Sequence, residues 1–133
     1  MNAKTLSIVI PFRIHPKLPH LLERLEDLLQ LLASVKHIEI IVVDSSSAPK
    51  HLLIHESICR NYQAIHLVML ENEAEYSLAR ARNAGATLAT GRWLCFHDID
   101  LRTSADFWPR LLDFCKNFGL GRFKKRYLAI PCI

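Results

Sequence analysis

Two aspartates, Asp98 and Asp100, lie just beyond the apolar run Trp93–Phe96, with His97 between the run and the first of them. In an open parallel sheet, ligands bind in the crevice beyond the carboxyl ends of the strands. Carboxylates bind Mg²⁺ in proteins, usually one or two of them together with the phosphate oxygens of a substrate. The pair is therefore a candidate site for a divalent cation that holds a phosphate group, and a solvated turn is the alternative interpretation.

Apolar runs alternate with amphipathic segments along the chain. We expect strands at 6–11, 38–43, 65–70, 92–97 and 127–130, and helices at 18–35, about 49–61, 76–89 and about 104–118, the last with Ser104 as N-cap. Strands that alternate with helical crossovers predict an α/β fold with a parallel, doubly wound sheet. Asp98 and Asp100 would then lie at the end of its fourth strand.

Length and composition bound the classes of protein to consider. The 133 residues, half of them hydrophobic, predict a single domain over 1–133 with a core of its own. A net charge of +4 is too small for the dense basic surface of a nucleic-acid-binding protein. The four cysteines are widely spaced, which favours reduced thiols in the cytoplasm over a zinc site or disulfides. The first apolar run is too short for a signal peptide or a membrane span.

Glycine usage excludes two nucleotide-binding classes. A dinucleotide- or methyl-donor-binding fold needs a glycine-rich turn after its first strand, and here the turn 11–16 contains no glycine. The chain has four glycines in all, at positions 85, 91, 119 and 121, so it holds no phosphate-binding P-loop either. A fold that binds its ligand with side chains and a cation remains.

Four motifs together resemble a known family. They are Ser7–Pro11, Ile40–Ser46, Ala81–Gly85, and Ala89–Gly91 leading through an apolar strand into Asp98–Asp100. Their order and spacing closely resemble the nucleotide-binding half of the GT-A glycosyltransferases of family 2 type, over roughly residues 5 to 103. The resemblance implies a Rossmann-like, mainly parallel sheet with helices on both faces, a truncated form of the GT-A nucleotide-diphospho-sugar transferase fold.

The resemblance also implies roles for residues at the ends of the first two strands. Pro11, Phe12 and Arg13 would line the base pocket of a nucleotide. Asp44 would accept a hydrogen bond from a uracil ring, whereas the residue taken without the other motifs favours a cap of the following helix.

Further roles follow for the later motifs. By the resemblance, Arg82 and Asn83 would shape the pocket near ribose and diphosphate, although both could simply be exposed on a helix. Asp100 would bind Mn²⁺ or Mg²⁺, and Asp98 the ribose or a metal-bound water. Such a cation neutralises the diphosphate leaving group as the sugar–oxygen bond breaks. The expected reaction is transfer of a hexosyl or N-acetylhexosaminyl group from a UDP-sugar to a glycan in polysaccharide biosynthesis, in the cytoplasm or peripherally at the inner face of the membrane.

The residues around the aspartate pair refine this expectation. Phe96–Leu101 is similar to the corresponding segment of galactosyl- and N-acetylgalactosaminyltransferases, which favours a UDP-galactose-type donor. His97 is either a third metal ligand or a core histidine, and strand alternation favours the core because it turns His97 away from Phe96 and Asp98. Trp93 and Trp108 are expected in the core, with sugar stacking as the alternative for Trp108.

The segment after Asp100 is short for an enzyme of this type. Residues 101–133 have room for one helix and one strand, so we expect the acceptor-binding half, with its general base, to be missing and this chain alone to be inactive. Uncovered sheet edges and helix faces would favour self-association. The alternatives are a non-catalytic nucleotide-sugar-binding fragment or regulatory module and a haloacid-dehalogenase-type phosphatase, whose signature Arg102 breaks.

Overall fold

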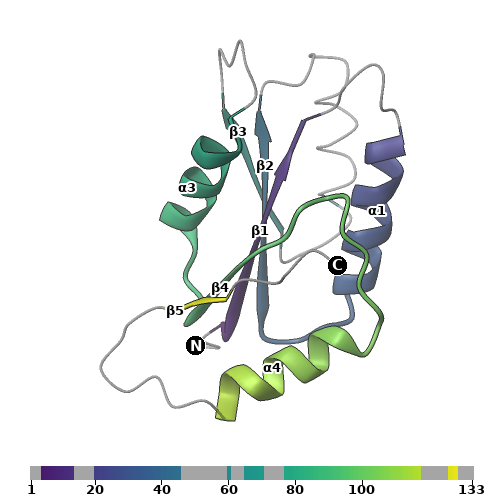
Figure 1. The fold of residues 1–133 in the computed structure, drawn as a ribbon, viewed down its shortest axis with the longest axis vertical. Coiled ribbons are helices and arrows are strands. Elements are labelled where there is room, and N and C mark those ends of the chain that lie inside the picture. The colour runs from purple at the N-terminus through teal and green to yellow at the C-terminus, as the bar shows by residue number, and fades with distance from the viewer. Residues whose placement is uncertain are drawn as a thin grey trace.

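The computed structural model describes residues 4–13, 20–45, 60, 65–70, 77–117 and 126–128. Apart from Arg60, the helix expected at about 49–61 lies outside these ranges. The elements are β1 (Leu6–Phe12), α1 (His20–Leu32), β2 (Ile38–Ser45), β3 (Ile65–Leu70), α3 (Leu78–Leu88), β4 (Trp93–Phe96), α4 (Phe107–Asn117) and β5 (Arg126–Leu128) (Figure 1). Strands and helices alternate as the sequence predicts.

The strands form one parallel sheet in the order β3-β2-β1-β4-β5. β1 lies at its centre because the chain winds outward first through β2 and β3, then returns to the other side of β1 with β4. The α/β fold class with a parallel sheet is therefore confirmed. All strands point the same way, so their carboxyl ends meet at one edge of the sheet (Figure 1).

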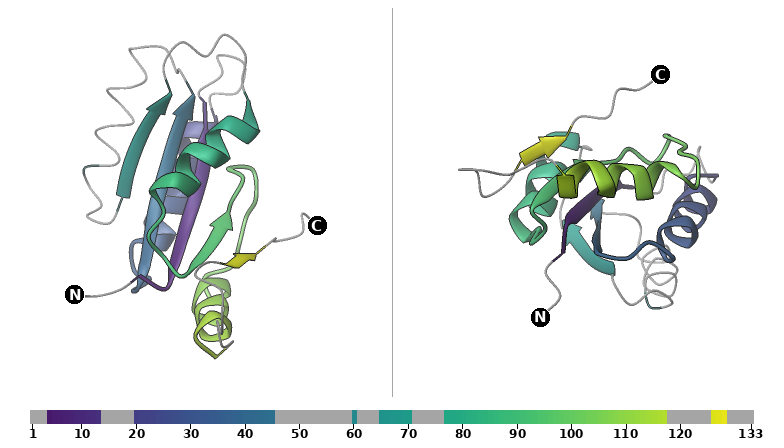
Figure 2. Two further views of the ribbon diagram at one scale, coloured as in Figure 1. Left: turned by 90° about the vertical axis from the view of Figure 1, so that its left-hand side faces the viewer. Right: turned by 90° about the horizontal axis from the view of Figure 1, so that it is seen from below.

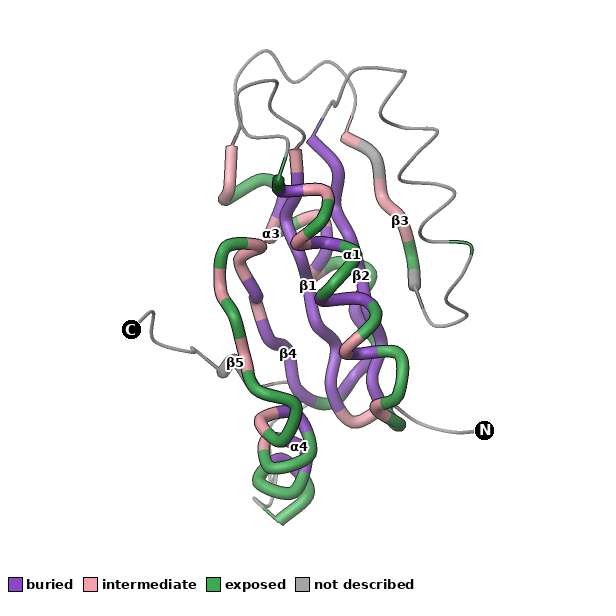
Figure 3. Tube along the Cα trace, turned by 90° about the vertical axis from the view of Figure 1, so that its right-hand side faces the viewer, coloured by how far each residue is buried: buried purple, intermediate pink, exposed green. Residues whose placement is uncertain are grey.

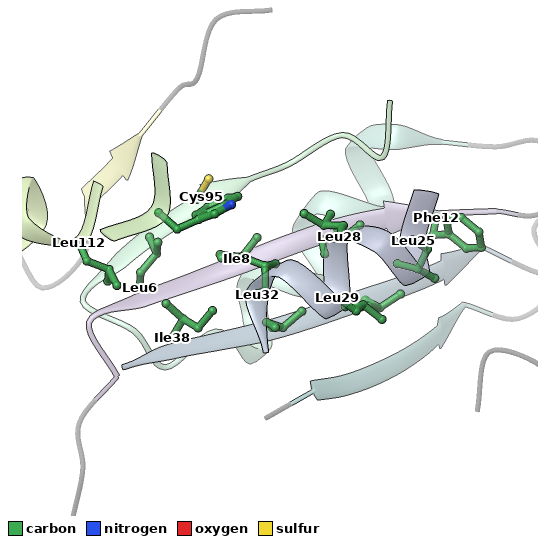
Figure 4. Close-up of a cluster of buried hydrophobic side chains, with 14 of the residues drawn as sticks. Leu6, Ile8, Phe12, Leu25, Leu28, Leu29, Leu32, Ile38, Cys95 and Leu112 are labelled. Carbon is green, nitrogen blue, oxygen red and sulfur yellow. The ribbon is translucent and has the colours of Figure 1, made fainter. Parts of the chain in front are cut away.

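Helices cover both faces of the sheet. In β1, alternate residues face opposite sides: Leu6 and Ile8 join a core cluster with α1 and α4, whereas Val9 joins a second cluster with α3. Figure 2 shows α3 alone in front of the sheet, and Figure 4 shows the leucines of α1 pointing at the strands. Buried residues run along β1 and β2, and exposed ones follow the outer sides of the helices (Figure 3). The core thus lies in two layers on either side of one sheet.

β1 continues one residue beyond Pro11, where the sequence predicted its end. In a strand, the main-chain N–H and C=O groups of successive residues point alternately toward the strand on one side and the strand on the other. The carbonyl of Val9 points toward β4, because it accepts a hydrogen bond from the amide of His97 at 2.9 Å. The main-chain groups of Pro11, two residues later, therefore also point to the side of β4, but β4 has already ended opposite Val9. The missing N–H of Pro11 breaks no ladder hydrogen bond, which allows the strand to extend.

α4 begins three residues later than expected. Ser104 does not serve as its N-cap because its hydroxyl donates to the carboxylate of Asp106 at 2.6 Å. The amide of Phe107 instead bonds to the carbonyl of Ser104 at 3.1 Å, which closes a turn in front of the helix. Local side-chain hydrogen bonds of this kind compete with capping.

Small residues let α3 approach the sheet closely. Ala81 is fully buried, and a Cβ atom built on Gly85 would lie 2.3 Å from Cγ1 of Val9 and 3.2 Å from Cγ2 of Val43. No larger residue fits at position 85 unless the helix moves away from β1 and β2. The Ala81–Gly85 motif therefore fixes the distance between α3 and the sheet.

A buried polar cluster ties three elements together at the amino edge of the sheet. Glu39 accepts hydrogen bonds from Ser7 Oγ at 3.3 Å, from the Thr90 amide at 3.1 Å and from the Thr90 hydroxyl. Ser7 Oγ in turn accepts from the amide of Gly91 at 2.8 Å. The Ala89–Gly91 motif is thus a structural junction between β1, β2 and β4, and we call these four residues the Glu39 cluster.

The described helices are short compared with the thickness of a bilayer. α1 has 13 residues, whereas about 20 apolar residues are needed to cross the hydrocarbon core. Within the described ranges, no helix has both the length and the hydropathy for a membrane span.

Candidate functional site

The carboxyl edge of β1, β2 and β4 brings together most of the predicted site residues. Phe12 pairs in register with Asp44 at the ends of β1 and β2. β4 ends opposite Val9, three residues earlier, and the chain then turns through Asp98–Leu101, closed by a hydrogen bond from the Leu101 amide to the Asp98 carbonyl at 3.1 Å. We call this segment the D-x-D turn. It lies at the edge where ligands bind in open α/β sheets.

Burial separates the predicted base-pocket residues. Arg13 is half-buried and Pro11 is buried. The Phe12 side chain is only 1% exposed and packs into the core cluster of α1, so only its main chain can line a pocket. Asp44 is fully buried at the end of β2. A carboxylate at such a depth contributes to the site only through a ligand that reaches into the edge of the sheet.

Arg82 on α3 connects the helix to the D-x-D turn. Its Nη2 lies 3.1 Å from Oδ1 of Asp98, and its guanidinium lies over the ring of Phe96, 5.7 Å from the ring centroid. Asp98 and Phe96 share a face of β4 by strand alternation, and the close approach of α3 brings Arg82 to both. The Nε of Arg82 is buried and has no hydrogen-bond partner among the described residues. That atom is shielded from solvent, whereas the Arg82 side chain as a whole is 36% exposed.

The structure does not bring Asn83 to the other predicted site residues. Asn83 is exposed, two positions after Ala81 and two before Gly85, the two residues through which α3 faces the sheet. At 100° per residue, Asn83 lies on the opposite side of the helix. Its main-chain carbonyl accepts a hydrogen bond from the Thr87 hydroxyl at 2.9 Å, within α3 itself.

The other side of the D-x-D turn contacts α1. Nη1 of Arg24 donates to the main-chain carbonyl of Asp100 at 3.3 Å. Ile99 packs against the core cluster of α1, and beside it lies a hollow of about 210 Å³ bordered by Arg24, Leu101 and Arg102. Sequence reasoning missed Arg24 because a contact across 76 residues leaves no local pattern.

The donor set of the turn fits a hard cation that shares its coordination with a substrate. Asp98 is partly exposed and Asp100 is exposed, so both carboxylates are within reach of solvent and of a ligand. Within the described ranges, no three His, Cys, Asp or Glu side chains gather in a metal-binding group. Two carboxylates suit Mg²⁺ or Mn²⁺ when diphosphate oxygens and water complete the shell.

His97 lies on the opposite face of β4 from Asp98, as alternation predicts. It is fully buried, and its ring lies 5.5 Å from that of Trp108. Burial lowers the pKa of His97 below its ordinary value, and the neighbouring Asp98 only partly offsets this. The expectation of a core histidine is confirmed, and Trp108, also fully buried, is confirmed as a core aromatic residue.

The lowered pKa of His97 predicts a pH-dependent loss of stability. Near and below pH of about 6.5 the unfolded chain binds more protons at this residue than the folded chain, because the pKa of His97 is lowered by folding. The unfolding free energy should therefore fall as the pH decreases. Compared with His97→Phe, the wild type should lose about 1 kcal/mol between pH 7.5 and 5.5 in urea unfolding. Equal slopes for wild type and His97→Phe would contradict the prediction.

The two described cysteines take no part in the site. Cys95 and Cys115 are free and buried. Burial raises the pKa of Cys95 to about 12 and that of Cys115 to about 11, so both remain thiols at neutral pH. They pack in the core cluster shared by α1 and α4.

Comparison with known proteins agrees with this geometry. The family description "Glycosyl transferase family 2" matches residues 7–121. The chain belongs to this family. Among curated proteins, it is 34% identical over 67 residues to the amylovoran biosynthesis glycosyltransferase AmsB of Erwinia amylovora. Among solved structures, it resembles S. aureus TarS 1–349 with a TM-score of 0.66 and 23% identity over 84% of this chain. The complex of TarS 1–349 with UDP matches with a TM-score of 0.55 and 26% identity over 72% of this chain.

The chain spans only part of the length of the relatives it matches. The matched region of AmsB amounts to 22% of that protein, and the matched regions of the two TarS 1–349 structures amount to 32% and 27% of theirs. The GT-A fold is shared with TarS. Family membership also leaves no place for the phosphatase interpretation.

Proposed function

We propose that this domain binds a UDP-sugar together with Mn²⁺ or Mg²⁺ at the carboxyl edge of β1, β2 and β4. The observation that carries the proposal is the Arg82–Asp98 pair over Phe96, which places one cationic and one anionic group beside Asp100 at that edge. The family and the UDP complex of TarS, a structural relative, support the choice of nucleotide. The whole protein would transfer a hexosyl or N-acetylhexosaminyl group from the UDP-sugar to a glycan.

Each side chain has a distinct task in this proposal. Asp100, being exposed, would hold the cation, which supplies charge neutralisation to the departing diphosphate. Asp98 would accept hydrogen bonds from the ribose while Arg82 keeps it in place. The accessible N–H groups of the Arg82 guanidinium would donate to the nucleotide, because the side chain is 36% exposed beside the turn.

The base would meet Asp44 at the end of β2. Uracil carries an N–H donor at its third ring position, whereas cytosine has an acceptor there, so a carboxylate at this place favours uracil. The peptide edges of Phe12 and Arg13, on the neighbouring strand end, would complete the pocket. The proposal gives no role to the side chain of Asn83.

Replacing Asp44 with alanine tests the base pocket. UDP should bind about 10-fold more weakly, since a hydrogen bond to a charged group is lost, while inorganic diphosphate should bind as before. Isothermal titration calorimetry in Mn²⁺ measures both constants. Equal losses for UDP and diphosphate would mean that Asp44 stabilises the strand end instead of contacting the base.

The conservative variant Asp44→Asn sharpens this test. The amide can donate as well as accept, so the preference for UDP over CDP should narrow while the size of the side chain is kept. A melting temperature close to that of the wild type shows that the fold is intact. An unchanged UDP-to-CDP ratio would place the base elsewhere.

A further inference from the structure

One buried side chain contacts residues on both sides of the D-x-D turn. The ring of Trp108 lies 5.5 Å from that of His97, which immediately precedes Asp98, with 34° between the two planes. Nε1 of Trp108 donates to the hydroxyl of Thr103 at 3.0 Å, two residues beyond Leu101. The segment 98–102 is thus held at each end by the same indole.

Trp108 is itself firmly anchored. It is the largest fully buried side chain among the described residues, and it lies in the first turn of α4. The ring of Phe107 meets it edge-on at 5.1 Å, and the rest of the indole packs in the core cluster of α1 and α4. An indole in such a close-packed site has little freedom to move. It is therefore a rigid support for a short exposed segment.

We infer that Trp108 is a positioning residue for the D-x-D turn. By holding His97 through ring packing and Thr103 through a hydrogen bond, it restricts the conformations of 98–102 before a ligand arrives. When residues that orient metal-binding side chains are replaced, the metal affinity commonly falls by about 10- to 100-fold. The inference rests on the proposed function, which assigns Asp98 and Asp100 to the binding of the UDP-sugar. Trp108 itself acts on the turn through His97 and Thr103.

The chain offers a matched control for the substitution Trp108→Phe. Trp93 lies at the other end of β4, is 4% exposed, belongs to the same core cluster and donates from its Nε1 to the carbonyl of Cys115 at 3.1 Å. Trp93→Phe therefore removes a buried indole N–H hydrogen bond of the same kind, but one that does not involve the turn. Both variants should lower the melting temperature by similar amounts, so that stability alone cannot explain a difference between them.

Thr103→Val removes the same hydrogen bond from the acceptor side. It keeps the shape of a half-buried threonine and leaves the indole in place, so it is the second route if Trp108→Phe does not fold. The effects of Trp108→Phe and Thr103→Val on the turn should not add in the double variant, because they remove one shared contact.

Amide hydrogen exchange of the ligand-free chain, measured by NMR, tests the inference directly. The Leu101 amide, which closes the turn on the Asp98 carbonyl, should exchange about 10-fold faster in Trp108→Phe and Thr103→Val than in the wild type or Trp93→Phe. Equal exchange in Trp108→Phe and Trp93→Phe, or wild-type exchange in Thr103→Val, would overturn the positioning role.

Calorimetry with UDP supplies the second measurement. The ratio of UDP affinities with Mn²⁺ and with EDTA should fall about 10-fold in Trp108→Phe and remain at the wild-type value in Trp93→Phe. If the wild-type chain bound UDP equally well with Mn²⁺ and with EDTA, the metal part of the proposed function would be refuted. The exchange measurement would still decide whether Trp108 positions the turn. Faster Leu101 exchange without any change in the Mn²⁺ ratio would overturn the inference that the turn is positioned for the donor.

Discussion

Replacing Asp100 with alanine should remove nearly all of the gain in UDP affinity that Mn²⁺ confers. The Asp100 carboxylate is exposed at the carboxyl edge of the sheet, so its loss takes away a cation ligand without opening a hole in the core. In Mn²⁺, the dissociation constant for UDP should rise by about 100-fold, or about 2.7 kcal/mol, whereas in EDTA it should stay near the wild-type value. Calorimetry in the two buffers gives both numbers.

Asp113→Ala is the matched control for this substitution. Asp113 is an exposed aspartate on α4, remote from the turn in sequence, and its replacement changes the net charge by the same amount. It should leave UDP binding unchanged in either buffer. A comparable loss in Asp113→Ala would mean that UDP responds to overall charge, and wild-type binding that is equal in Mn²⁺ and EDTA would refute the metal assignment.

Asp98 gives a less direct test than Asp100. Its carboxylate lies 3.1 Å from Nη2 of Arg82, with both side chains more than a third exposed. Asp98→Ala would release Arg82 as well as remove a ligand-binding group, so one measurement would combine two effects. The contrast shows why two aspartates of one motif should not be expected to contribute equally.

The sheet and the place of the site could be predicted because their signals are local. Strands buried on both faces appear in the sequence as continuous apolar runs, and the runs that became β1, β2 and β4 are of this kind. Asp98 and Asp100 follow one of them, which is enough to place them at a strand end. Alternation along β4 likewise placed His97 on the core face, because a strand reverses its side chains at every residue.

The partners of the D-x-D turn could not be predicted, because each comes from a distant element. Arg82 reaches Asp98 only because Gly85 lets α3 approach the sheet, and Arg24 reaches the turn from α1. The tie between Trp108 and Thr103 spans a loop, where no periodicity applies. Asn83 lies on the far side of α3 by helical spacing from Ala81, and its role near ribose and diphosphate stays a prediction.

The Glu39 cluster was also missed, although one sign of it is in the sequence. Glu39 is a single acidic residue within the apolar run of β2, and a carboxylate that is only 4% exposed requires hydrogen-bond donors nearby. The donors come from Ser7 and Thr90, which belong to two different motifs. Their meeting at the amino edge explains why both motifs contain a small hydroxyl residue.

Replacing Gly91 with alanine should destabilise the fold more than any surface substitution. A Cβ atom at this position would lie 2.6 Å from Ser7 Oγ, 2.7 Å from the Ser7 amide nitrogen and 2.9 Å from the carbonyl carbon of Leu6. Two of these three atoms are main-chain atoms of β1, which cannot move away without shifting the central strand. The clash would also displace the Gly91 amide from its hydrogen bond to Ser7 Oγ.

We expect a loss of about 3 kcal/mol in unfolding free energy, from overpacking and a broken buried hydrogen bond together. The melting temperature should fall by on the order of 10 °C in a chain of this size. Ser7→Ala in the Gly91→Ala background should not restore stability, because the main-chain contacts remain when Oγ is removed. Recovery in that double variant would show that the hydroxyl alone limits the space.

The position of Gly91 also separates stability from function. The Glu39 cluster lies at the amino edge, and the D-x-D turn lies at the carboxyl edge beyond β4. At a temperature well below the transition of the variant, Gly91→Ala should therefore bind UDP in Mn²⁺ within about twofold of the wild type, since the folded fraction remains close to one. A large loss of UDP affinity in a folded Gly91→Ala chain would mean that a shift of β1 is transmitted along the strand to Phe12 and Arg13, and the two edges of the sheet would then have to be treated as one site.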